Sequence, residues 1–411
     1  MNRREVKRAP VLRFKGFTND WEQRKLKKLG FFYKGKGYTK KDLINDGVPI
    51  LLYGELYTHY SEKISNTRLH TKLLLHSIFS AGNEVVLPDS GETSTDIARA
   101  SWISNSGIIL AGGLIIIKPN EYIFPGFLAY SLTYGENHKL LASRAQGKSI
   151  VHIHANDLKT LNIIYPENLK EQQRIFALLE KLNKCIALQQ RKVKMLILLK
   201  KEISNYYFSP SYLSRSCKEN SFKEIFTVVT DYVANGSFKS LRENVKTNTK
   251  QGYAYMIRLQ DASNNWKGPW LYTDKSGYNF LKKSKIYPGD IVMSNVGSVG
   301  KIIRIPKLSK PMTLAPNAIL LRSTKYDNDF LYELLKSDYG KNKIKRMTTP
   351  GVQNKINKTD FKKIKVHLPN SQEQKRISCL LTNMNILIHE VKSNISQKQK
   401  LKQFLLQNMF I

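Results

Sequence analysis

The sequence predicts an α+β protein in which two mixed α/β domains are separated by two long, coiled-coil-like helices, arranged as a tandem repeat with pseudo-two-fold symmetry. The first observation behind this prediction is an internal repeat, because Glu171-Gln172 recurs as Glu373-Gln374, 202 positions later. The second is that each half joins short strand-like runs to one helical segment of about 40 residues. Tandem copies present two similar surfaces at a fixed separation, so we expect a long ligand with two sites in succession.

The strand-like regions lie between Leu26 and Tyr165 and again between Phe222 and Leu368. Both contain short apolar runs bounded by turn residues, which is typical of strands with interspersed short helices. The runs are Val48–Tyr53, Glu84–Leu87 and Leu114–Ile117 in the first region, and Tyr253–Leu259, Asp290–Met293 and Ala318–Leu321 in the second.

Each helical segment has apolar residues in steps of three, four or seven, which predicts an amphipathic helix. At about 1.5 Å per residue each helix is roughly 55 to 60 Å long, too long for its own domain to cover, so we expect each to pack against the other. Asn168 with Glu171, and Asn370 with Glu373, predict capping boxes at the two helix starts. The apolar positions are Ile175, Leu179, Leu182, Ile186, Val193, Leu196, Ile203 and Tyr207, then Ile377, Leu381, Met384, Ile388, Val391, Ile395, Leu405 and Met409.

The composition points to a polyanionic partner. The 411 residues carry a formal net charge of +35, and that length predicts two to three domains. Such an excess of positive charge favours binding to polyphosphate, and a long ligand with two sites indicates double-stranded DNA. A highly soluble, solvated surface is the alternative reading of the same charge.

Cysteine usage predicts a reducing, cytoplasmic location. Cys185, Cys217 and Cys379 are far apart and lack CxxC spacing, which indicates neither a disulfide framework nor a zinc site. The basic N-terminus is not followed by an apolar segment, and Ile108–Ile117 is too short to span a bilayer. We therefore expect neither secretion nor membrane insertion.

Common catalytic and cofactor-binding motifs are missing from the sequence. No GxGxxG, GxxxxGK[ST] or HExxH motif occurs, and the glycines of Gly35-Lys36-Gly37 are typical of a turn. His152 and His154 are spaced as metal ligands on a strand, but the second copy has Lys355 and Asn357 there. We therefore predict no catalytic residue, no metal site and no cofactor in this chain.

Polar residues around Gly147 and Gly351 form the first group of candidate DNA contacts. Arg, Lys, Gln and Asn side chains can read base edges, whereas Ser and Thr hold phosphates. An ordinary exposed turn is the alternative. The candidates are Arg144, Gln146, Lys148 and Ser149 in the first copy, and Arg346, Thr349, Gln353 and Lys355 in the second.

Further candidates lie on other loops of both copies. Basic, amide and aromatic residues there suit groove binding, and the lack of identity between the copies suits the reading of two different sequences. Solvated loops remain the alternative. These candidates are Lys34, Lys36, Tyr38, Lys40, Ser90, Thr93 and Ser94, then Asn235, Ser237, Lys239, Arg258, Gln260, Asn295 and Ser298.

Three features together resemble the specificity subunit of a Type I restriction-modification system. They are the run Leu12–Glu22, the run PGDIVMSNVGSVGK at Pro288–Lys301, and the twice-occurring order Gly, Asp-[Leu/Phe], Pro, Glu-Gln-x-Arg-Ile followed by a long helix. The resemblance covers essentially the whole chain. It implies a non-catalytic subunit with two target recognition domains, each reading one half of an asymmetric, bipartite DNA sequence.

The same resemblance implies partners. The antiparallel helices would set the spacer between the half-sites and dock two modification (methyltransferase) subunits, which carry S-adenosylmethionine. Restriction subunits, which use ATP and Mg, would join to cleave. We expect Leu178, Leu198, Leu199, Leu380 and Leu387 to be exposed beyond the helix seam and available to partners.

Applied to this chain, the resemblance implies the boundaries of its domains and conserved helices. They are an N-terminal arm at 1–19, target recognition domain 1 at 20–165, a central conserved helix at 166–208, a linker at 209–221, target recognition domain 2 at 212–368 and a C-terminal conserved helix at 369–411. The first copy departs from the pattern at Asn83, where the second has Asp290, which predicts a looser turn there.

Two other functions fit parts of the sequence. A self-contained DNA-modifying enzyme would be active without partners, and a tandem RNA-binding or architectural protein would bind all duplexes equally at fixed salt.

Overall fold

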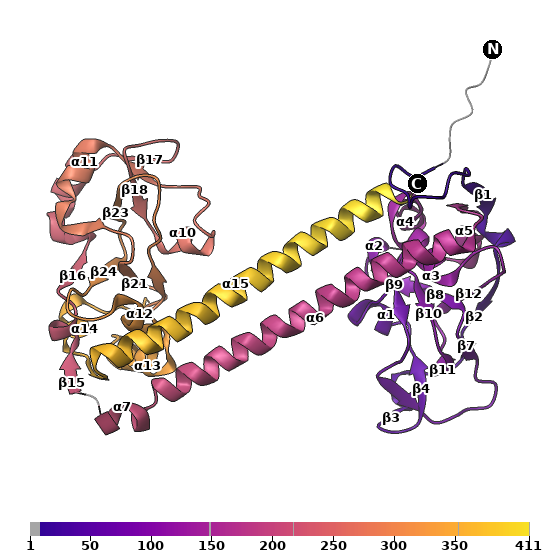
Figure 1. Ribbon diagram of the computed structural model, residues 1–411, viewed down its shortest axis with the longest axis horizontal. Coiled ribbons are helices and arrows are strands. Elements are labelled where there is room, and N and C mark those ends of the chain that lie inside the picture. The colour runs from indigo at the N-terminus through magenta and orange to yellow at the C-terminus, as the bar shows by residue number, and fades with distance from the viewer. Residues whose placement is uncertain (1–8, 148, 217, 352, 411) are drawn as a thin grey trace, which may run out of the picture. The chain divides into compact units, whose positions relative to one another are not determined.

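The computed structural model describes residues 9–147, 149–216, 218–351 and 353–410, which fall into two compact units (Figure 1). Unit 1 comprises Met1–Gln190 and Ser393–Ile411, and unit 2 comprises Arg191–Lys392. Each unit contains one mixed α/β domain, the N-terminal part of one long helix and the C-terminal part of the other. The predicted fold class is confirmed.

The domain of unit 1 is built on two five-stranded sheets and two separate strand pairs. One sheet has the order β2 (Gly30–Lys34), β12 (Leu114–Pro119), β8 (Glu84–Pro88), β10 (Ser101–Ile103), β5 (Lys63–Ile64). The other has the order β3 (Leu43–Ile44), β6 (Leu69–Thr71), β4 (Val48–Leu51), β11 (Ser106–Leu110), β7 (Phe79–Ala81). β1 (Glu22–Lys25) pairs antiparallel with β14 (Asn162–Tyr165), and β9 (Ser90–Gly91) with β13 (Val151–His152).

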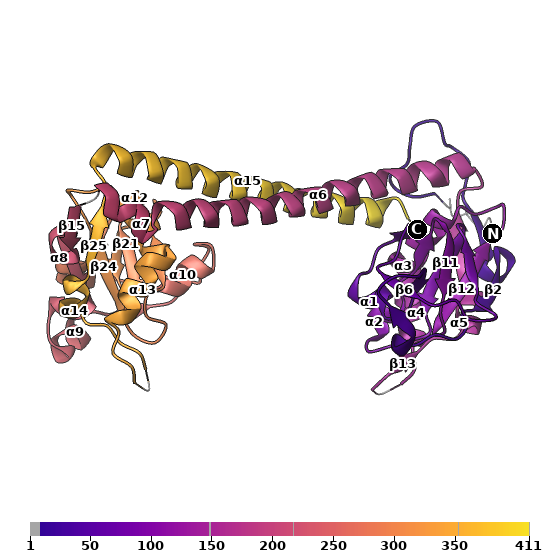
Figure 2. The same ribbon diagram turned by 90° about the horizontal axis from the view of Figure 1, so that it is seen from below.

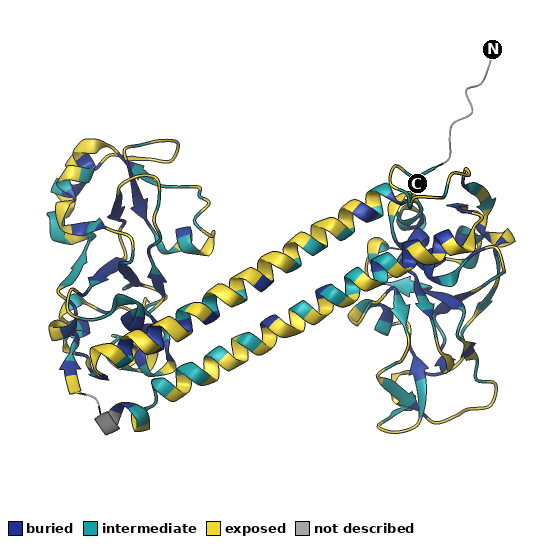
Figure 3. Cartoon of the chain, in the orientation of Figure 1, coloured by how far each residue is buried: buried dark blue, intermediate teal, exposed yellow. Residues whose placement is uncertain are grey.

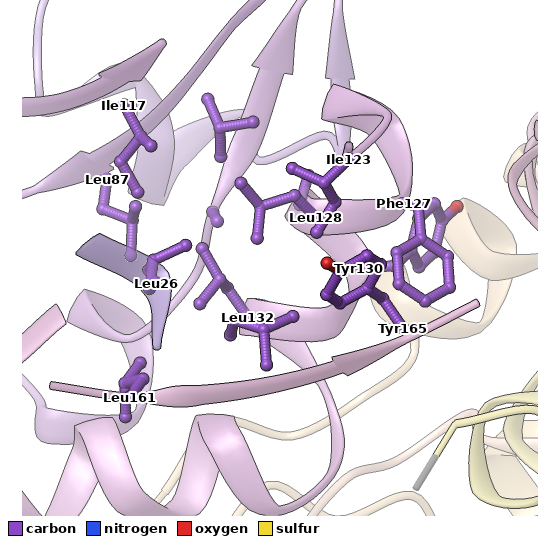
Figure 4. Close-up of a cluster of buried hydrophobic side chains, with 14 of the residues drawn as sticks. Leu26, Leu87, Ile117, Ile123, Phe127, Leu128, Tyr130, Leu132, Leu161 and Tyr165 are labelled. Carbon is purple, nitrogen blue, oxygen red and sulfur yellow. The ribbon is translucent and has the colours of Figure 1, made fainter. Parts of the chain in front are cut away.

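Short helices complete this domain. They are η1 (Leu26–Lys28), η2 (Lys40–Asp42), α1 (Glu55–Thr58), α2 (Ser94–Ile97), α3 (Pro125–Thr133), α4 (Gly135–Arg144) and α5 (Ala155–Lys159). Every residue of α3 from Gly126 onward is buried, which explains why this helix is apolar on all sides. Figure 4 shows Leu128 and Leu132 of α3 beside Leu87 and Ile117 of the first sheet.

The domain of unit 2 repeats this plan. A four-stranded sheet has the order β16 (Val228–Asp231), β24 (Ala318–Arg322), β21 (Ile291–Ser294), β22 (Ile302–Arg304). A five-stranded sheet has the order β17 (Thr247–Asn248), β19 (Tyr272–Thr273), β18 (Ala254–Ile257), β23 (Met312–Leu314), β20 (Lys285–Ile286). β15 (Lys218–Ser221) pairs antiparallel with β25 (Lys365–Leu368), as β1 does with β14.

The helices of this domain include counterparts of those in unit 1. They are α7 (Pro210–Ser216), α8 (Phe222–Ile225), η3 (Tyr232–Asn235), α9 (Phe238–Asn244), α10 (Leu259–Ser263), α11 (Lys275–Phe280), η4 (Lys282–Ser284), α12 (Asn328–Lys336), α13 (Asp338–Arg346) and α14 (Lys358–Lys363). In chain order α12, α13 and α14 correspond to α3, α4 and α5. The predicted linker is therefore structured, because Pro210–Ser216 is helical and β15 begins at Lys218; Cys217 lies outside the described residues.

The two long helices are α6 (Leu169–Tyr207) and α15 (Ser371–Asn408), of 39 and 38 residues. In unit 2 the Arg376 guanidinium near the start of α15 donates to the Tyr207 hydroxyl at the end of α6, at 3.2 Å. In unit 1 Leu405, near the end of α15, joins the core that holds Ile175 of α6. The helices therefore run antiparallel.

Every position of the predicted apolar stripes is buried or half-buried, and Figure 3 shows the exposed faces beside them.

The helix starts differ from the predicted capping boxes. Asn168 caps as expected, since its Oδ1 accepts from Lys170 N at 2.9 Å, and Asn370 Oδ1 accepts from Glu373 N at 2.9 Å. The Glu171 carboxylate instead binds the Arg13 guanidinium at 2.6 and 2.9 Å. Glu373 likewise accepts from the Tyr212 hydroxyl. A cation or hydroxyl outcompetes the backbone amide for the carboxylate, so this part of the prediction was wrong.

The turn at Asn83 is not looser than its counterpart. In unit 2 the buried Asp290 carboxylate accepts from Tyr287 N at 2.7 Å and binds Arg322. In unit 1 the next residue takes this role, because the Glu84 carboxylate accepts from the amides of Ala81, Gly82 and Asn83 at 2.8 to 3.2 Å. The turn is closed by a carboxylate displaced by one position.

Within the described part of the chain, no helix combines the length and apolar character needed to cross a bilayer.

Candidate nucleic-acid interface

In unit 1 three strands bring candidate residues to one edge of the sheet. Lys34 ends β2 and Pro88 ends β8, whereas Leu114 begins the antiparallel β12 between them. Asp89 N donates to Gly113 O at 2.9 Å, and Gly35 N donates to Leu114 O at 3.1 Å. The exposed Lys34 and Lys36 therefore lie at the same edge as the half-buried Ser90. The Lys34 ammonium is 3.6 Å from the Asp89 carboxylate.

A hairpin at 146–152, the first hairpin, extends this edge. Gln146 and His152 exchange both amide hydrogen bonds, at 3.1 and 2.8 Å, and β13 pairs with β9. A Cβ at Gly147 would lie 1.8 Å from Ile150 O, so the tight turn requires glycine. Figure 2 shows the segment leading to β13 protruding from the domain. Gln146 and Ser149 are exposed; Lys148 lies outside the described residues.

Unit 2 contains an equivalent hairpin at 349–355, the second hairpin. Thr349 and Lys355 exchange amide hydrogen bonds at 2.8 and 3.1 Å. The hairpin packs on the loop after β21, where Gly297 N donates to Asn354 O at 2.9 Å and Ile356 N donates to Asn295 O at 3.1 Å. The candidates that this arrangement gathers in unit 2 are the exposed Ser298, Thr349, Gln353 and Lys355, with the half-buried Asn295. Arg346 is also exposed, but it lines a pocket with Ser204 and Phe208 at the end of α6.

Sequence reasoning missed the residue that supports the first hairpin. The Tyr57 hydroxyl donates to Ser90 O, and the Tyr57 ring packs against Gly91. Burial raises the pKa of this hydroxyl, so it stays protonated at neutral pH and keeps its donor. Nothing in the local pattern distinguishes this tyrosine from the exposed Tyr53 nearby.

Several candidates in unit 1 use their polar groups inside the domain. Tyr38 is buried, and its hydroxyl lies 2.5 Å from Ser77 Oγ. Thr93 caps α2, where its Oγ1 accepts from Asp96 N at 3.1 Å, and Ser94 is the first residue of that helix. The Arg144 guanidinium donates to Asp157 O at 2.5 Å and Thr160 Oγ1 at 2.7 Å. Lys40 is exposed in η2.

The same is true of unit 2. The Asn235 Nδ2 donates to Ser284 Oγ at 2.8 Å, and its Oδ1 accepts from Lys283 N at 2.9 Å. Ser237 caps α9 by accepting from Ser240 N at 3.2 Å. The Arg258 guanidinium binds the buried Asp261 carboxylate at 2.7 Å and Pro269 O at 2.6 Å. The remaining candidates, Lys239 on α9 and Gln260 on α10, are exposed.

The histidines near the first hairpin do not form a metal site. His152 is exposed in β13, whereas His154 caps α5 opposite Asp157. Its counterpart Asn357 caps α14 with Asp360. Among the residues that the structure describes, no three His, Cys, Asp or Glu side chains gather as they would to hold a metal ion.

Comparison with known proteins agrees with the two-domain architecture. The Type I restriction modification DNA specificity domain matches residues 18–197 and again residues 218–398. The Type I restriction enzyme MjaVIII specificity subunit of Methanocaldococcus jannaschii is 23% identical over 404 residues, covering 93% of this chain and 90% of that protein. The putative type I restriction enzyme MjaX specificity subunit of the same organism is 27% identical over 303 residues, covering 71% of this chain and 68% of that protein.

Solved structures share the fold. The Type I restriction-modification system S subunit from M. genitalium aligns with a TM-score of 0.60 at 17% identity, covering 98% of this chain and 99% of that one. A structure described for complex assembly and conformational transition of the type I R-M system aligns with a TM-score of 0.54 at 16% identity, with the same coverage. Two matches to one family description, one in each repeat, account for most of the sequence. This chain therefore belongs to the family of Type I restriction-modification specificity subunits.

Proposed function

We propose that this chain is the DNA sequence-specificity subunit of a Type I restriction-modification complex and binds a bipartite, asymmetric target in double-stranded DNA. The observation that carries the proposal is the pair of equivalent hairpins at 146–152 and 349–355, each packed on the loop that follows an inner strand of a corresponding sheet, β8 in unit 1 and β21 in unit 2. Equivalent backbones with different side chains suit the reading of two different half-sites.

The chemistry of the hairpins supports contact with duplex DNA. Gln146 corresponds to Thr349, and His152 to Lys355, so each hairpin offers its own set of donors and acceptors. Amide and cationic side chains discriminate base pairs in the major groove, whereas hydroxyls and lysines bind the phosphates. The net charge of +35 supplies the sequence-independent part of the affinity.

The long helices support docking of partner subunits. Leu199 of α6 and Leu401 of α15 occupy equivalent positions and are 53% and 49% exposed. Leu198, Leu380 and Leu387 are exposed as expected. Leu178 packs against the core of unit 1, so the expectation that it is exposed was wrong. Exposed leucines on a helix suit an apolar partner surface. We propose two modification subunits, which bring S-adenosylmethionine, and restriction subunits, which bring ATP and Mg.

Methyl-transfer assays test the division of labour. We expect the purified chain to be inert with DNA and S-adenosylmethionine, and a modification subunit to restore methyl transfer. Activity of the chain alone would favour a self-contained enzyme. Competition binding at fixed salt tests the other alternative, because equal affinity for all duplexes would favour a protein without sequence preference.

Methylation mapping of genomic DNA with the assembled complex then tests the two-part target. Exchange of residues 20–165 for those of a relative should change one half of the methylated sequence and leave the other. Both halves changing together would contradict the proposal.

A further inference from the structure

A buried glutamate joins the domain of unit 1 to both long helices. Glu62, just before β5, is 7% exposed. Its carboxylate accepts from Lys402 Nζ of α15 at 2.7 Å and from Asn183 Nδ2 of α6 at 3.1 Å. The Tyr134 hydroxyl adds a third donor at 2.5 Å. We call Glu62, Lys402 and Asn183 the first junction.

Unit 2 contains a second junction of the same composition. Glu333 of α12 is 4% exposed. Its carboxylate accepts from Lys200 Nζ of α6 at 2.9 Å and from Asn385 Nδ2 of α15 at 2.9 Å. Each glutamate is therefore bound by a lysine from the C-terminal part of one helix and an asparagine from the N-terminal part of the other.

The helix residues of the two junctions are equivalent, but the glutamates are not. Asn183 recurs as Asn385 and Lys200 as Lys402, each 202 positions later. Glu62 precedes a strand, whereas Glu333 lies in a helix whose counterpart is α3. In unit 1 that counterpart contributes Tyr130, whose hydroxyl accepts from Asn183 at 2.8 Å. The same arrangement is thus reached from different domain elements, which indicates a role for it beyond inherited packing.

Each junction favours one orientation of its domain on the two helices. A buried carboxylate left without its cation is strongly destabilised, so the bound geometry is much preferred over any in which the domain has turned away from one helix. Because the donors come from both helices, the carboxylate is satisfied only when the domain contacts both. Each junction therefore fixes how its domain is oriented on the helix pair.

We infer that the two junctions are positioning elements that make binding selective for the number of base pairs between the two half-sites. This inference rests on the proposed function. A domain that can turn on its helices carries its hairpin with it, and misplacement by about 1 Å can lower a rate by as much as about 100-fold. A loosened junction therefore lets the hairpin reach targets with the wrong spacer, so discrimination falls while half-site preference stays.

The test uses the full chain assembled with its modification subunits. Methylation rates are measured on the natural target and on duplexes with the spacer one base pair longer or shorter. We expect Lys402→Met and Lys200→Met each to reduce the ratio of natural to altered-spacer rates by roughly tenfold. Lys402→Arg, which keeps the charge, should retain most of the ratio.

Matched controls separate positioning from stability. Lys400→Met and Lys201→Met remove exposed lysines from the same helices and should leave the ratio unchanged. If Lys402→Met does not assemble, Glu62→Gln preserves the side-chain size and serves instead. Junction variants that lose thermal stability but keep full spacer discrimination would overturn the inference. A wild-type complex without any two-part target would instead overturn the proposed function.

Discussion

At the scale of single residues, the recurring Glu-Gln pair is structural. Gln172 is buried, and its Oε1 accepts from Phe124 N at 2.7 Å while its Nε2 donates to Tyr122 O at 3.0 Å. The buried Gln374 donates to Pro369 O at 2.8 Å, and its Oε1 accepts from Asp327 N of the domain at 3.4 Å. Each glutamine anchors a helix start to its own domain. A recurring residue in this chain can therefore mark the scaffold as well as the interface.

We predict that Gln172→Ala lowers the free energy of unfolding by about 1–3 kcal/mol, because it leaves the buried Pro166 carbonyl and the partly buried Phe124 amide without their partner. Urea or thermal unfolding measures this effect. Gln173→Ala is the matched control, since that neighbouring side chain is exposed. Equal stability of the two variants would contradict the structural role.

The second hairpin gives a residue-scale prediction of DNA affinity. Lys355 is exposed beside Gln353. We expect Lys355→Ala to weaken DNA binding and to reduce the slope of log affinity against log salt by about 1, because one phosphate contact is lost. Lys375→Ala, on the exposed part of α15, is the control. An unchanged slope would place Lys355 away from the phosphates.

At the scale of elements, the sequence predicts what is long or periodic. β8, β12, β21 and β24 lie within or overlap the apolar runs that predict them, and both long helices begin where Asn caps them. Strands of two residues, such as β3 and β5, are too short to show periodicity. The helix within the predicted linker was not predicted, because Ser and Pro at 209–211, which commonly form loops, start a helix here: Ser209 Oγ accepts from Tyr212 N at 3.1 Å.

The candidate interface was predictable in its position but not in all of its residues. Both hairpins surround the glycines that the sequence singles out, and Gly147 is required by close backbone approach. Composition alone does not show whether a polar group faces solvent or its own domain. Asn235 and Arg258 illustrate this, because their donors bind Ser284 and Asp261. Tertiary contacts decide that question.

The first junction predicts a pH dependence. Burial alone would raise the pKa of Glu62, but attraction and hydrogen bonding from Lys402, with the bond from Tyr134, hold it below its ordinary value of 4.5. A lowered folded-state pKa contributes stability that is present above the unfolded pKa and lost as pH falls through the folded pKa. The stability gap between wild type and Glu62→Gln should therefore shrink from about pH 7 to about pH 3. A constant gap in urea titrations would contradict this.

At the scale of the whole molecule, the chain divides into its two units at equivalent positions of the two helices. The division falls after Gln190 in α6 and after Lys392 in α15, which are 202 positions apart. Residues nearer the helix ends, such as Tyr207, are held by contacts within a unit. Changes in helix length are therefore better tolerated at the division than near Ser204–Tyr207.

We predict that seven residues inserted after both Gln190 and Lys392 lengthen the preferred DNA spacer by about 3 base pairs. Two helical turns keep the apolar stripe in register and add about 10 Å, against about 3.4 Å per base pair. Methylation mapping of the complex measures the spacer. Insertion in α6 alone should break the register between the helices and abolish methylation.

Leu199 and Leu401 also have a consequence for how the chain is produced in a cell. Apolar surface of this kind that stays exposed to solvent promotes aggregation and is recognised by chaperones and proteases. If partner subunits cover Leu199 and Leu401 as proposed, molecules made in excess over these partners should be degraded, whereas assembled ones should persist. The abundance of the chain would then follow the supply of the partner subunits.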